Sequence, residues 1–112
     1  MRTRQDVARR LSNLIDASGK TQREIAQEAG FASQNIISMI KNGDTKVPLN
    51  RVPALAASLG VEPQDLFADC LEAYEPELFE VYAMCAPGLL VSPKQVRIIR
   101  LLARASRAGL LS

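Results

Sequence analysis

The sequence contains no histidine and only two cysteines, Cys70 and Cys85. Two cysteines at this spacing without histidine do not form a zinc site, so no metal is expected. We interpret them as partly buried helix residues, with a disulfide or a redox switch as the alternative. There is also no glycine-rich phosphate loop, because the glycines fall at predicted helix ends. We therefore expect no cofactor and no enzymatic activity.

Acidic side chains do not change this expectation. Asp65, Asp69 and Glu72 recur at helical spacing, which is typical of a solvated helix face and not of a catalytic carboxylate pair. An enzyme remains a rival class of function, but the sequence offers no catalytic residues for it.

Aromatic residues are scarce, at 4% of a chain that is 47% hydrophobic. Small aliphatic side chains must therefore fill the core, which suits helices packed on helices. No apolar run approaches the roughly 18 residues that a membrane-spanning helix needs. The N-terminus lacks the apolar segment of a signal peptide. We expect a cytoplasmic protein with no membrane partner.

Helical periodicity predicts five short helices in the first part of the chain. In the helix predicted over 4–18, one apolar stripe contains Val7, Leu11, Leu14 and Ile15. Asn50 is predicted to cap a fourth helix, with Pro53 in its first turn. A fifth helix is predicted from Pro63 to about Ala73. No strand pattern is found, so the predicted fold class is all-α, with one domain over 1–73.

Two of these helices and a tight turn lie between Thr21 and Gly43. Thr21 and Glu24 form a capping-box pattern that satisfies the free amides at a helix start. Gly30 is predicted to end this helix in the left-handed conformation. Ser33 is predicted to cap the second helix, which ends at Asn42-Gly43.

The second helix carries the side chains most suited to a ligand. Gln34, Asn35 and Ser38 are polar and uncharged, and amides of this kind match the donor and acceptor pattern of adenine in the DNA major groove. Met39 and Ile36 could contact thymine methyl groups, although Ile36 could equally pack in the core. Four flanking cations could neutralise phosphates or simply be solvated: Arg23, Lys41, Lys46 and Arg51.

Several motifs together resemble the phage-repressor and Cro-like helix-turn-helix family. They are Thr21-Gln22-x-Glu24-Ile25-Ala26, Gly30, Ile37, Ile40, Asn42-Gly43, Thr45-Lys46-x-Pro48 and Leu55-Ala56 to Leu59-Gly60-Val61. The resemblance covers about residues 7–67. It implies a five-helix lambda-repressor-like domain that binds double-stranded DNA, usually as a homodimer on a palindromic operator.

The resemblance also implies roles for single residues. The family position that matches Gln22 contacts a phosphate, and those that match Gln34 and Asn35 touch bases. Ser38 and Met39 match positions further along the same face. Asn42 and the following loop, with Thr45 and Lys46, match positions that contact the DNA backbone. Apart from the resemblance, the flanking cations Arg23 and Lys41 are expected to contact phosphates because of their charge.

Residues 74–112 are predicted to form a helical extension for dimerisation or partner binding. Residues 62–93 contain seven acidic and no basic side chains, whereas 94–112 contain five basic and no acidic ones. A last helix is predicted over 94–107, with a basic stripe and an apolar side that includes Ile98, Ile99, Leu102 and Ala105. This helix could pack on its own domain, form a homodimer contact, or contact DNA or a membrane.

The sequence therefore predicts a sequence-specific transcriptional regulator, a repressor that binds a palindromic operator as a homodimer. The alternative is an antitoxin-like interaction module that binds a partner protein through residues 74–112. Truncation after Ala73 would discriminate between them, because only the second predicts that a protein partner is lost.

Overall fold

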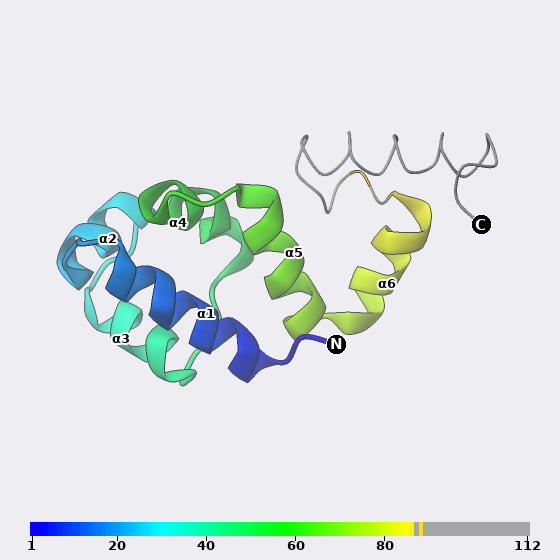
Figure 1. The fold of residues 1–112 in the computed structure, drawn as a ribbon, viewed down its shortest axis with the longest axis horizontal. Coiled ribbons are helices and arrows are strands. Elements are labelled where there is room, and N and C mark those ends of the chain that lie inside the picture. The colour runs from blue at the N-terminus through cyan, green and yellow to red at the C-terminus, as the bar shows by residue number, and fades with distance from the viewer. Residues whose placement is uncertain (87, 89–112) are drawn as a thin grey trace, which may run out of the picture.

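In the computed structural model, residues 1–86 and 88 are described, and the regular secondary structure of this part of the chain consists of helices only (Figure 1). The predicted all-α class is confirmed. The elements are α1 (Arg4–Ala17), α2 (Gln22–Ala29), α3 (Asn35–Asn42), the 3-10 helix η1 (Leu49–Arg51), α4 (Val52–Leu59), α5 (Pro63–Tyr74) and α6 (Pro76–Cys85). The helix predicted over 94–107 lies outside the described residues.

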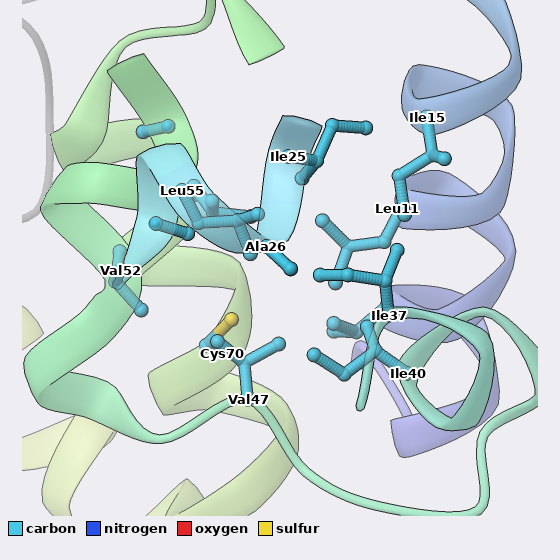
Figure 2. Packing of buried hydrophobic residues seen from close by; sticks show 14 residues of the cluster. Leu11, Ile15, Ile25, Ala26, Ile37, Ile40, Val47, Val52, Leu55 and Cys70 are labelled. Atoms are coloured by element: carbon cyan, nitrogen blue, oxygen red, sulfur yellow. The ribbon is translucent and has the colours of Figure 1, made fainter. Parts of the chain in front are cut away.

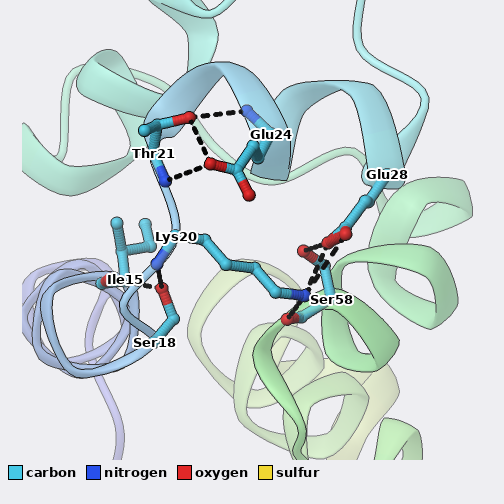
Figure 3. A network of polar contacts seen from close by, with 7 residues as sticks. All are labelled: Ile15, Ser18, Lys20, Thr21, Glu24, Glu28 and Ser58. Carbon is cyan, nitrogen blue, oxygen red and sulfur yellow. Dashed lines mark hydrogen bonds and ion pairs between the residues drawn. The ribbon is translucent and has the colours of Figure 1, made fainter.

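The start of α2 is the capping box that the sequence predicts. The Glu24 amide donates to Thr21 Oγ1 at 3.1 Å, and the Thr21 amide donates to Glu24 Oε1 at 3.4 Å (Figure 3). A second capping box, between Thr3 and Asp6, begins α1. Because these bonds satisfy free amides, both helices have a defined first turn.

The starts of α3 and α4 differ from the prediction in detail. The predicted Ser33 cap is wrong, because α3 begins at Asn35 with Gln34 as its N-cap and no side-chain cap bond. The Ser33 hydroxyl, one residue further out, accepts a hydrogen bond from the Asn35 amide at 3.2 Å. The predicted Asn50 cap is wrong, because Asn50 lies inside η1 and no side chain caps α4. The Arg51 amide instead donates to the Pro48 carbonyl at 2.9 Å, so a tight 3-10 turn leads into α4.

The last two described helices are separated by one residue. Glu75 has a φ of −137°, and Pro76 begins α6. Proline lacks an N–H and disfavours the helical conformation of the preceding residue, so α5 stops and a new helix starts. A boundary between domains near residue 73 stays a prediction.

The core lies where α1 to α5 meet (Figure 2). Each of these helices contributes buried aliphatic residues, and Val47 adds one from the loop before η1. The predicted stripe of α1 is buried at Val7, Leu11 and Ile15, with Leu14 partly buried. Since the core draws on all five helices, it fixes α3 relative to the other four.

The two cysteines are not equivalent, and the prediction that both are partly buried is wrong. Cys70 is fully buried on the inner face of α5, whereas Cys85 is exposed near the end of α6, and both are free thiols. Burial raises the pKa of the Cys70 thiol to about 11. Cys70 therefore acts as a small apolar core residue.

The helices pack in a definite order, with α1 against α3 and α5, and α2 against α4. Helix α6 packs on α5 and projects away from α2, α3 and α4 (Figure 1). No helix among residues 1–86 and 88 is long and apolar enough to cross a membrane.

Candidate nucleic-acid interface

Helix α3 has an inner and an outer side. Ile37 and Ile40 are 0% and 2% exposed and anchor the helix in the core. Gln34 and Asn35 at its start are exposed, and Met39 is 42% exposed. A rigidly anchored helix that presents amides and a thioether outward has the form needed to read base edges.

Ile36 does not belong to the outer side. It is partly buried and packs against the core cluster. Of its two sequence interpretations, core packing therefore accounts for this side chain. Ile36 is less exposed than Met39 and so has less surface to offer a thymine methyl group.

Gln22 and Ser38 connect α2 to α3. The Ser38 hydroxyl donates to Gln22 Oε1 at 2.7 Å, and both side chains are partly buried. The bond occupies the amide oxygen and leaves the Gln22 NH2 group with donors to offer. Ser38 therefore helps to orient Gln22, and the pair places a donor beside the outer side of α3.

Two arginines, Arg23 and Arg51, each lie beside part of the turn between α2 and α3. Gly30 has a φ of +79°, and a Cβ there would lie 3.1 Å from Arg51 Nη1. The left-handed conformation favours glycine at this position, and a Cβ there would also displace the end of the flexible Arg51 side chain slightly. Arg23 lines a depression of about 340 Å³ together with Ser33 and Gln34. Arg23 is therefore exposed beside the residues that precede α3, and Arg51 is exposed near Gly30.

Lys41 is not a free cation. Its Nζ lies 2.7 Å from Asp16 Oδ1 on α1, and the two side chains are 22% and 64% exposed. The ion pair supports the contact between α1 and α3. It also neutralises part of the charge that Lys41 would offer to a phosphate.

The last residue of α3 and the loop after it carry the other predicted phosphate contacts. Asn42 and Lys46 are exposed, and Thr45 is partly buried. Lys46 Nζ lies 5.5 Å from the centroid of the Tyr74 ring. The next residue, Val47, points inward and is 1% exposed, so the loop is anchored directly beside Lys46.

A cluster of polar side chains holds α2 against α4. Lys20 Nζ lies 2.6 Å from Glu28 Oε1 and donates to the Ser58 carbonyl at 2.8 Å, while the Ser58 hydroxyl donates to Glu28 at 2.7 Å (Figure 3). These bonds connect the loop before α2 with α2 and α4. Hydrogen bonds from Lys20 and then Ser58 hold the pKa of Glu28 below its ordinary value.

Two residues with a role here were missed by the sequence analysis. Asp16 pairs with Lys41, and Tyr74 contacts both Lys46 and Val47. Each partner is more than 20 positions distant along the chain. No local pattern indicates such contacts, because they depend on how α1 and α5 pack against the rest.

Some predicted sites cannot be placed. Ile98, Ile99, Leu102 and Ala105, predicted for dimer or partner contacts, lie outside the described residues. Among residues 1–86 and 88, no group of three or more potential metal ligands is found.

Comparison with known proteins gives one match. The family model described as Helix-turn-helix matches residues 11–66, the segment that contains α2, α3 and the core around them. Searches of curated proteins and of solved structures found no match.

Proposed function

We propose that this protein is a repressor. The chain belongs to the Cro/C1-like helix-turn-helix family and is thus a DNA-binding transcription regulator. The proposed target is a palindromic operator bound by a homodimer. The single observation that carries the proposal is the outer side of α3, where Gln34, Asn35 and Met39 are exposed on a helix anchored by buried isoleucines.

In the proposed complex, α3 lies in the major groove. Gln34 and Asn35 read base edges, with Met39 beside thymine methyl groups and Ser38 at the edge of the contact. The phosphates are contacted by residues that surround this helix: Gln22, Arg23, Lys41, Asn42, Thr45, Lys46 and Arg51.

The test is a selection of the purified protein against a random DNA duplex library, with titrations of the selected site at several salt concentrations. We expect an inverted repeat with half-sites about one helical turn apart. Binding of the repeat should be much tighter than that of scrambled DNA, and affinity should fall as salt increases. No enriched motif at low salt would contradict sequence-specific binding.

Three variants separate base reading from phosphate contact. Gln34→Ala and Asn35→Ala should each cost about 1–3 kcal/mol of discrimination at particular base pairs. Lys46→Ala should weaken binding to all sequences and reduce the salt slope by about 0.9. Equal weakening of every sequence by all three variants would exclude base reading by α3.

The homodimer is supported by the surface of α6. Leu78, Val81 and Met84 are 46%, 55% and 85% exposed, and no residue of α6 is buried. Exposed apolar side chains on one helix commonly mark an interaction surface. The acidic stretch 62–93 and the basic stretch 94–112 would also attract each other between two copies.

The oligomeric state can be measured on the full chain by sedimentation equilibrium. We expect a dimer for the unmodified protein and a monomer for Val81→Glu, which places a charge on the α6 surface. Glu80→Gln is the matched control and should leave the dimer intact. A monomeric unmodified protein at concentrations that saturate DNA would contradict the homodimer.

The same α6 surface favours a second candidate function, binding of a partner protein through residues 74–112 in the manner of an antitoxin. Co-purification from the source cells would recover this partner with the unmodified chain and lose it with Val81→Glu. If Val81→Glu changes only the oligomeric state, the surface serves the homodimer alone.

A further inference from the structure

The loop between α3 and η1 carries proposed phosphate contacts but has no regular structure of its own between Asn42 and Leu49. A loop of this kind needs contacts from elsewhere to keep one conformation, since otherwise its side chains would be ordered only on binding. Two contacts beside Lys46 come from one side chain at the end of α5, Tyr74.

The first contact fixes the backbone. The Val47 amide donates to Tyr74 Oη at 3.1 Å, and Val47 itself is 1% exposed. A buried amide without an acceptor would be costly. The tyrosine hydroxyl therefore supplies the hydrogen-bond acceptor that no neighbouring carbonyl of the loop supplies to the Val47 amide.

The second contact fixes a side chain. Lys46 Nζ lies 5.5 Å from the centroid of the Tyr74 ring, within the range of a cation–π interaction. Lys46 and Val47 are consecutive, with the first exposed and the second buried. Tyr74 thus contacts both: its hydroxyl binds the inward residue, and its ring lies beneath the outward one.

This contact leaves the Lys46 charge available. Lys20 and Lys41 are within 2.7 Å of carboxylates. Among the described residues, by contrast, no carboxylate oxygen lies within 4 Å of Lys46 Nζ. An aromatic face restrains an exposed ammonium without cancelling its charge. Lys46 is therefore ordered in advance and still able to bind an anion.

We propose that Tyr74 is a positioning residue for DNA binding: it fixes the loop that contains Lys46 so that this ammonium meets a backbone phosphate. The inference rests on the proposed function, because it assumes that Lys46 contacts DNA. Tyr74 lies outside the segment matched by the family model. It connects the end of α5 to the loop that contains Lys46.

The test compares Tyr74→Phe with Tyr82→Phe in the full chain. Both variants lose one hydroxyl, but Tyr82 lies on α6, and only Tyr74 contacts the loop. Tyr74→Phe should bind all duplexes several-fold more weakly and reduce the slope of log K against log salt by up to about 0.9, one phosphate contact. Tyr82→Phe should match the unmodified protein in both DNA affinity and salt slope.

A double-mutant cycle with Lys46→Ala identifies the route of the effect. If Tyr74 acts through Lys46, Tyr74→Phe should cost almost nothing once Lys46 is alanine. Full additivity of the two substitutions, or an unchanged salt slope in Tyr74→Phe, would overturn the proposal.

Amide hydrogen exchange of Val47 tests the contact without DNA. Exchange should be faster in Tyr74→Phe than in the unmodified protein or in Tyr82→Phe, and equal rates in all three would overturn the proposal. If the unmodified protein binds no DNA at low salt, the proposed function fails and this inference fails with it. If it binds its operator and Tyr74→Phe binds equally well, only this inference fails.

Discussion

The Ser38 hydroxyl donates a hydrogen bond of 2.7 Å to Gln22 Oε1, and so a residue within α3 orients the first residue of α2. The bond uses the oxygen of the Gln22 amide and leaves its NH2 group for another partner. The relationship makes the two helices one unit at the point where a phosphate contact is proposed.

Substitution of Gln22 should separate these two roles. Gln22→Ala should weaken binding to every duplex by about 1.5–3 kcal/mol, the usual range for a hydrogen bond to a charged group. Gln22→Glu still accepts the Ser38 hydroxyl but repels phosphate, so it should bind more weakly than Gln22→Ala. The measurement is a titration with operator and scrambled DNA, and tighter binding by Gln22→Glu would exclude the phosphate contact.

Removal of the Asp16 charge should strengthen DNA binding. Asp16 lies 2.7 Å from Lys41, so Asp16→Asn frees the ammonium for phosphate and removes a repulsive charge. We expect higher affinity and a salt slope steeper by up to about 0.9. Stability should change by less than about 1 kcal/mol, because the pair is near the surface.

The matched control for this prediction is Asp65→Asn, which makes the same charge change on α5. It should affect DNA affinity much less than Asp16→Asn does. Equal gains from both variants would mean that overall charge matters and that the pairing with Lys41 does not.

Two substitutions on α3 should distinguish its inner side from its outer side. Ile37 is 0% exposed and Met39 is 42% exposed. Ile37→Ala should lower the free energy of unfolding by about 2–5 kcal/mol through the cavity that it leaves. Met39→Ala should change stability little but weaken operator binding. Denaturant unfolding and DNA titration measure the two effects. The opposite pattern would contradict the assignment of Ile37 to the inner side and Met39 to the outer side of α3.

Stability should depend on pH through Glu28. Hydrogen bonds from Lys20 and Ser58 lower its pKa in the folded protein below the ordinary value of 4.5. The stabilisation is therefore present above pH 4.5 and is lost as pH falls through the lowered folded pKa. Asp6, whose pKa is lowered by Thr3, contributes with the same sign.

Glu28→Gln isolates the contribution of Glu28 from that of Asp6. The melting temperature of the variant should fall less steeply than that of the unmodified protein as pH decreases below 4.5. Thermal melts at a series of pH values measure this difference. Parallel curves for the two proteins would show that Glu28 does not contribute to the acid sensitivity.

Much of this fold could be predicted because its determinants are local. Apolar residues at helical spacing, the Thr21–Glu24 capping box and the glycine at position 30 act within a few residues of chain. The family model that matches residues 11–66 agrees with the resemblance drawn from these motifs. The cap at Asn50 was predicted wrongly because a 3-10 turn competes with a side-chain cap over the same few residues.

The sequence by itself determined the helices, the helix-turn-helix unit and the side chains that α3 carries. The tertiary structure decided which of these side chains are available: Ile36 packs on the core, Lys41 is paired with Asp16, and Lys46 remains exposed above Tyr74. The physical reason is distance along the chain. Helix periodicity and capping act between near neighbours, whereas the environment of a surface charge depends on residues from α1 and α5 that only packing brings close.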